Sequence, residues 1–208
     1  VQNFLFRNDG DLVFTDLGAS SAVAFDVNGN STGAMGIDAA DFANAGYLGV
    51  AVGNFAGENT SFYVQQTAPF LFAEMSNLEG IGSPSRGRLT FGLFFFDADL
   101  DGRLDLVVAN AGQNRITVFQ GRGDLSFDTI LVPTAYRPAS VAIADLNDDN
   151  LPDLIVARAD TPHFDLLLNT SPSFSAECPG DVDGDLWVSV YDFAIFASHF
   201  SQTTQILT

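Results

Sequence analysis

The sequence has few of the residues on which most catalytic and nucleic-acid-binding sites depend. Among 208 residues there are one cysteine and two histidines, and eight basic residues face 26 acidic ones, giving a net charge of −18. The lone Cys178 cannot form a disulfide within the chain, and such an acidic balance makes nucleic acid a poor partner. His163 and His199 have no evident zinc or catalytic partners. We therefore expect a protein that is not an enzyme and does not bind nucleic acid.

Long apolar runs are also missing. The densest one, residues 91–96, is far shorter than a membrane span, so we expect no membrane insertion. The chain begins at Val1 without a segment typical of a signal peptide, so we expect a mature form or a fragment of a longer protein. Apolar residues nevertheless make up 47% of the chain, with 20 phenylalanines, which favours a packed core over disorder.

The acidic residues are concentrated in three loops, 97–105, 145–153 and 181–192, which together hold twelve of the 26 carboxylates. In each loop oxygen side chains occupy positions 1, 3, 5 and 9, and the last loop adds position 12, which is the spacing of calcium ligands. Position 7 is expected to contribute a backbone carbonyl. The candidate ligands are Asp97, Asp99, Asp101, Arg103 and Asp105; Asp145, Asn147, Asp149, Leu151 and Asp153; and Asp181, Asp183, Asp185, Trp187, Ser189 and Asp192.

Electrostatics supports a bound cation at these loops. Two like charges about 5 Å apart repel by roughly 3 kcal/mol at an effective dielectric constant of about 20. A divalent cation would remove this cost, whereas the alternative interpretation is a solvated polar turn. We predict calcium at all three loops.

Apolar strands, acidic turns and closing hairpins recur along the chain and predict an all-β fold. The clearest unit runs through 89–96, the turn 97–105, then 104–109, 116–119 and 125–127, and a second runs through 139–144, 145–153, 154–157 and a hairpin over 164–174. An earlier unit spans 34–72 with its turn at 41–49, and a hairpin over 4–14 opens the chain. Four strands per unit indicate about three and a half blades of a β-propeller, as a partial or open ring.

The C-terminal part has a different pattern. Residues 1–174 form the repeat region, a Pro/Ser-rich linker covers 175–180, and a calcium loop and helix occupy 181–208. Apolar residues at 190, 193, 194, 196, 197 and 200 predict one amphipathic helix.

The repeats resemble the VCBS/FG-GAP family of extracellular β-propellers, whose turns carry the pattern D-x-D-x-D-G-x-x-D. Residues 33–41 and 53–59 also resemble the propeller arrays found with ASPIC/UnbV domains. The stretch 178–200 is similar to the first half of a type I dockerin, a module that binds a cohesin. In the turn at 41–49 the family's later ligand positions are occupied by Ala43, Ala45 and Gly49, so we expect no calcium there.

These features favour a secreted, calcium-binding scaffold or binding module, located outside the cell or at its surface. The resemblance implies a cohesin-like or cell-surface protein partner, and a carbohydrate ligand is possible. The alternative is an accessory portion of a larger polysaccharide-degrading enzyme. The tripeptide at 122–124 matches an adhesion sequence, but Gly and Asp are expected in a hairpin turn in any case.

Overall fold

The computed structural model describes residues 2–86, 89–169 and 201–203, and these form antiparallel strands with almost no helix. The strands are β1 (Phe6–Gly10), β2 (Val13–Asp16), β3 (Gly36–Ala40), β4 (Gly49–Gly53), β5 (Ser61–Gln65), β6 (Phe72–Glu74), β7 (Thr90–Phe96), β8 (Asp105–Asn110), β9 (Arg115–Gly121), β10 (Phe127–Pro133), β11 (Pro138–Ala144), β12 (Asp153–Arg158), β13 (Phe164–Leu168) and β14 (Ser201–Thr203). The helix α1 (Gly82–Ser85) has four residues. In the part of the chain described here, no helix has the length and apolarity that crossing a membrane requires.

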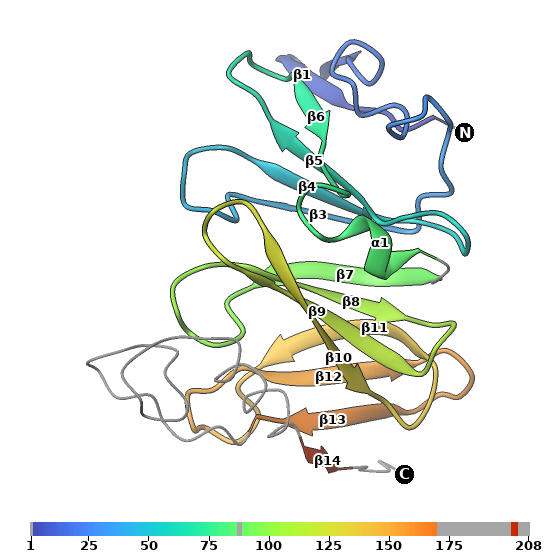
Figure 1. Ribbon diagram of the computed structural model, residues 1–208, viewed down its shortest axis with the longest axis vertical. Coiled ribbons are helices and arrows are strands. Elements are labelled where there is room, and N and C mark those ends of the chain that lie inside the picture. The colour runs from blue at the N-terminus through green and yellow to red at the C-terminus, as the bar shows by residue number, and fades with distance from the viewer. Residues whose placement is uncertain (1, 87–88, 170–200, 204–208) are drawn as a thin grey trace.

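The strands form one two-stranded and three four-stranded sheets, with the orders β1-β2, β3-β4-β5-β6, β7-β8-β9-β10 and β11-β12-β13-β14. All their pairings are antiparallel. Figure 1 shows the sheets following one another in chain order along the long axis of the molecule. The predicted all-β fold is confirmed, and the described sheets do not close into a ring.

The turns at 41–49, 97–105 and 145–153 each join the first two strands of a four-stranded sheet. The pairs that close the three turns are Ala40 with Gly49, Phe96 with Asp105, and Ala144 with Asp153. The ninth position of the turn is therefore the first residue of the second strand, which brings its side chain to the sheet. The three turns lie on the same side of the stack (Figure 1), and the Asn44 side-chain amide donates to the Gly102 carbonyl across 2.8 Å.

The core lies between the sheets. One apolar cluster joins the second and third sheets through Phe62, Leu106 and Phe119. Another joins the third and fourth sheets through Val107, Val118 and Val156. Strand β8 is buried along its whole length because it is covered on both faces. The continuous apolar run of this strand fits a position enclosed between neighbouring sheets.

The end of each sheet opposite the acidic turns is also repeated. Polar pairs seven residues apart link the second strand of a sheet to the third: Asn54 with Ser61, Asn110 with Thr117, and Arg158 with Asp165. The Arg158 and Asp165 side chains are only 7% and 5% exposed, and the guanidinium of Arg158 lies 3.9 Å from the ring centre of Tyr136. Each of these three sheets thus pairs two polar side chains at the same place in the repeat.

Three expected boundaries differ from the structure. In the hairpin after β9, Leu125 lies in the turn with φ +75° and β10 begins at Phe127, later and longer than the predicted 125–127. The first hairpin, expected over 4–14, ends later, at Asp16, and its turn lies at Asp11 and Leu12, with φ +50° and +62°. Strand β13 pairs with β14, far along the chain, although a local hairpin over 164–174 was expected. The predicted helix at 190–200 lies outside the described residues.

Candidate metal centre

The turn after β7 is organised by the carboxylate of its first residue, Asp97. This carboxylate accepts hydrogen bonds from the backbone N–H groups of Asp101, at 3.1 Å, and Gly102, at 2.9 Å. The backbone is left-handed at Leu100 (φ +60°) and at Gly102 (φ +86°), which coils the chain tightly around the carboxylate. Glycine adopts such a conformation without steric cost. Because the backbone coils in this way, the side chains of the odd-numbered residues can converge on one point.

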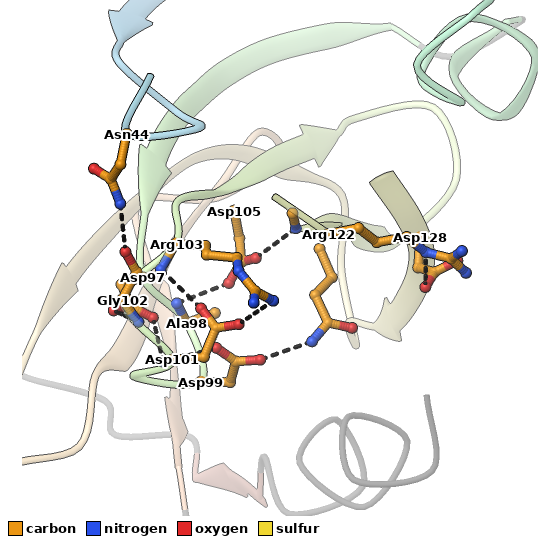
Figure 2. A network of polar contacts seen from close by, with 12 residues as sticks. Asn44, Asp97, Ala98, Asp99, Asp101, Gly102, Arg103, Asp105, Arg122 and Asp128 are labelled. Carbon is orange, nitrogen blue, oxygen red and sulfur yellow. Dashed lines mark hydrogen bonds and ion pairs between the residues drawn. The ribbon is translucent and has the colours of Figure 1, made fainter. Parts of the chain in front are cut away.

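Three carboxylates meet inside this coil. Asp97, Asp99 and Asp105 each bring one oxygen to within 4.8 Å of the others, and they are the one such group of His, Cys, Asp and Glu side chains found in the described ranges. Figure 2 shows Asp99 and Asp105, with Asp101 near them, in this turn. The structure therefore brings together Asp97, Asp99 and Asp105, three of the five predicted ligand residues of the turn.

Asp105 and Asp99 are held from outside the turn as well. Asp105, the first residue of β8, accepts hydrogen bonds from the N–H groups of Ala98 and Gly121, both at 2.8 Å. Asp99 accepts one from the side-chain amide of Gln120 at 2.7 Å. Sequence reasoning missed Gln120, because no spacing within the turn indicates a partner on β9.

The electrostatics of this cluster is unfavourable without a cation. Asp99 and Asp105 are 2% and 1% exposed. Burial, followed by the charge of Asp101, raises the pKa of Asp99 to about 7. Burial, followed by the charge of Asp99, holds the pKa of Asp105 well above its usual value, and burial also raises the pKa of Asp97. Each pair of ionised carboxylates at 4.8 Å repels by about 3.5 kcal/mol at an effective dielectric constant of about 20.

Arg103 was predicted to offer its backbone carbonyl as a ligand. Among the described residues, its guanidinium is the cationic group that forms an ion pair with this turn. Its guanidinium lies 3.2 Å from Asp101, and its N–H donates to the same carboxylate at 2.8 Å. The guanidinium is half exposed, so this pair contributes little to stability. The three converging carboxylates therefore keep their mutual repulsion.

The turn at 145–153 repeats the backbone arrangement. Asp145 accepts hydrogen bonds from the N–H groups of Asp149 and Asn150, at 3.2 and 2.8 Å, and Asn150 takes the left-handed conformation of Gly102, with φ +66°. Asp153 accepts from Leu146 at 2.9 Å and from Asn169 at 2.7 Å, as Asp105 does from Ala98 and Gly121. The turns at 97–105 and 145–153 thus share one backbone conformation and one set of backbone hydrogen bonds.

Their surroundings differ. Asp145, Asn147 and Asp149 are exposed, and Asp153 is buried. Burial opposes the ionisation of Asp145, but the N–H bonds from Asn150 and Asp149 outweigh it, and its pKa lies below the usual value. The Asn147 amide donates to Asp149 at 2.8 Å, and the predicted carbonyl ligand Leu151 donates its N–H to the same carboxylate at 2.8 Å. The structure does not gather three carboxylates here as it does in the preceding turn.

The turn at 41–49 keeps the same coil without the ligand side chains. Asp41 accepts hydrogen bonds from Ala45 at 3.0 Å and Gly46 at 2.9 Å, the same two positions as in the other turns. A Cβ atom added at Gly49 would lie 2.5 Å from the ring of Phe42, which is buried. An aromatic side chain therefore takes the space that belongs to the ninth-position carboxylate in the other two turns.

A further turn of this kind, missed by sequence reasoning, lies at residues 26–30. Asp26 accepts hydrogen bonds from the N–H groups of Asn28 at 2.9 Å and Asn30 at 2.7 Å, and Gly29 at its fourth position has φ +79°. The signal was present as oxygen side chains at positions 1, 3 and 5. No strand pair frames it as in the acidic turns, because it lies between β2 and β3.

Other candidates contribute less. In the hairpin tip at 121–124, Arg122 donates two hydrogen bonds to Asp128 (Figure 2). Asp124 accepts one from Ser126, so these side chains stabilise their own hairpin. The third predicted site, Asp181, Asp183, Asp185, Trp187, Ser189 and Asp192, lies outside the described residues.

Comparison with known proteins agrees with the repeat reading. No curated protein matches the chain. The matched family model covers both intact acidic turns and the strands between them. It identifies residues 97–156 as an FG-GAP-like repeat.

Proposed function

We propose that this protein is a secreted, non-catalytic binding or scaffold module whose repeated sheets are stabilised by calcium. The observation that carries the proposal is the convergence of Asp97, Asp99 and Asp105 at the start of a buried strand. Two of these carboxylates are almost fully buried, and burial raises the pKa of each of the three. Buried carboxylates without a cationic partner are costly, and a bound cation removes that cost.

The donor set fits calcium. Calcium binds six to eight oxygens at about 2.4 Å, so two of its ligands can lie at most about 4.8 Å apart. The three carboxylate oxygens satisfy this limit already. Asp101 and the carbonyl of Arg103 would complete the first site. Asp145, Asn147, Asp149, Asp153 and the carbonyl of Leu151 would hold a second ion in a more exposed turn.

The effect of calcium would be structural. The cation would tie the end of one strand to the start of the next and relieve the repulsion within the turn. In the β7–β10 and β11–β14 sheets the ninth-position carboxylate also accepts an N–H from the third strand or just beyond it, so the turn is joined to that strand as well. The FG-GAP-like repeat at 97–156 and the stacked sheets support a propeller arrangement of blades as an open arc. Residues 181–192 would supply a dockerin-like unit for docking to a protein partner.

Calorimetric titration of the chelator-stripped protein with calcium tests this proposal. We expect binding at 97–105, a second, weaker event at 145–153, and a rise in melting temperature. Calcium at one hundred times its dissociation constant would add about 2.7 kcal/mol per site. Asp99→Asn should remove the tighter event, and Asp148→Asn, which changes an exposed carboxylate at a position without ligand character, should leave both. Titration without heat and without a melting shift would refute the proposal.

A further inference from the structure

A polar cavity lies at the end of the β3–β6 sheet opposite the turn at 41–49. Its volume is about 520 Å³, and it is bordered by the loop around Asp26, the β4–β5 loop, the end of β6 and Arg86. The turn at 26–30, which sequence reasoning missed, forms one wall. The cavity is therefore separate from the metal centre at 97–105.

The lining mixes hydrogen-bond donors and acceptors. Carboxylates come from Asp26, Glu58 and Glu74 and the guanidinium from Arg86, and amide and hydroxyl side chains, among them those of Asn59 and Asn77, line the rest. The hydroxyl of Thr32 has no hydrogen-bond partner although the residue is only 6% exposed. A buried hydroxyl without a partner costs free energy, and a ligand or water in the cavity would recover it.

We propose that this cavity binds a neutral, polyhydroxylated ligand, a saccharide unit. Hydroxyl groups both donate and accept hydrogen bonds, so they match a lining that offers both in a small space. An anion would meet three carboxylates. A metal ion would need converging acceptors, and the group of three found in the described ranges lies at the other site. An apolar ligand would leave these polar side chains unpaired.

The walls are held in place before any ligand arrives. Glu58 accepts the N–H of Gly33 at 2.8 Å, and Glu74 accepts those of Phe62 and Ser76 at 3.3 and 3.2 Å. Asn59 donates to Asn77 at 3.3 Å and joins the β4–β5 loop to the residues after β6. A preorganised site loses less conformational entropy on binding, which favours recognition of a ligand that contributes only hydrogen bonds.

Calorimetry and ligand-observed NMR on the full chain in calcium test the proposal, with methyl glycosides of glucose, galactose, mannose, xylose and rhamnose as probes. We expect saturable binding of at least one glycoside. Arg86→Ala should weaken it at least about tenfold, as expected for a lost hydrogen bond to a charged group. Arg115→Ala, a matched change at the first residue of β9, should leave the affinity unchanged.

A second measurement works even if a variant fails to fold. In the wild-type protein, the side-chain amide resonances of Asn59 and Asn77 should shift on titration with the bound glycoside, while that of Asn44 at the opposite end should not. Absence of binding by all five glycosides overturns the proposal, as does binding with Asn59 and Asn77 unmoved. Binding of tri-lysine that is lost in Glu58→Gln, without glycoside binding, would assign the cavity to a basic ligand and also overturn it.

Discussion

In calcium-free solution the protein should lose stability as the pH rises from 5 to 7.5. Burial raises the pKa of Asp99 from 3.8 to about 7, so the folded protein retains a proton that the unfolded chain releases. The contribution of this group to stability is therefore complete below pH 3.8 and is lost as the pH rises toward 7.

The magnitude follows from the shift. Over its whole range the Asp99 shift corresponds to about 4 kcal/mol, of which about 2.5 kcal/mol falls between pH 5 and 7.5. Asp97 and Asp105 shift in the same direction and add to the loss. The pKa values of Asp9, Asp26, Asp124 and Asp145 are lowered from 3.8, so these groups titrate below this window. For a chain of this size the expected fall in melting temperature is about 5 to 10 °C.

Thermal and urea unfolding in excess chelator, at pH 5 and pH 7.5, measure this difference. Saturating calcium should flatten or reverse the slope, because the cation binds the ionised carboxylates and competes with protons. Asp99→Asn should remove most of the slope in chelator, and Asp148→Asn, in the exposed second turn, should preserve it. Stability that is constant or rises between the two pH values in chelator would refute the reasoning.

Three further predictions concern single side chains. Asp97→Ala should reduce the bound calcium by one equivalent in metal analysis, whereas Asp41→Ala should leave the stoichiometry unchanged and cost only about 1 kcal/mol through its lost turn hydrogen bonds; an equal loss of calcium from both would contradict this. Arg158→Met should destabilise the protein by about 3 kcal/mol in urea unfolding, because it leaves the buried carboxylate of Asp165 unpaired, and the double change with Asp165→Leu should recover much of that loss. Gly49→Ala should destabilise by about 1 to 3 kcal/mol, since its Cβ would overlap a buried aromatic ring; a neutral effect in urea unfolding would show that the ring can move.

Local patterns predicted most of the strands. The apolar run before Asp97 and the one after Asp105 form β7 and β8, and the turn between them starts and ends where its carboxylates indicated. This works because a strand covered on both faces needs a continuous apolar run, and a carboxylate that starts a turn interrupts it. The hairpin tip at Leu125 was placed less well, since left-handed positions can be occupied by residues that give no turn signal.

Long-range pairing could not be read from the sequence. Strand β14 completes the fourth sheet beside β13, although more than 30 residues separate them along the chain. A nearby segment ending in phenylalanine was the expected partner. Hydrogen bonding between strands depends on which backbone edge is free in space, and sequence distance carries little information about that.

The sequence by itself determined where the acidic turns lie and which residues could hold a cation, because ligand spacing and strand ends are local properties. Only the tertiary structure decided how differently the two intact turns are placed. Asp99 is buried against Gln120 of β9 in a sheet packed between two others, whereas Asp145 and Asn147 belong to the fourth sheet and remain exposed. The same pattern thus has a raised pKa in one turn and a lowered one in the other. The reason is physical: removal of water and the approach of neighbouring charges set the cost of ionisation, and both come from parts of the chain distant in sequence.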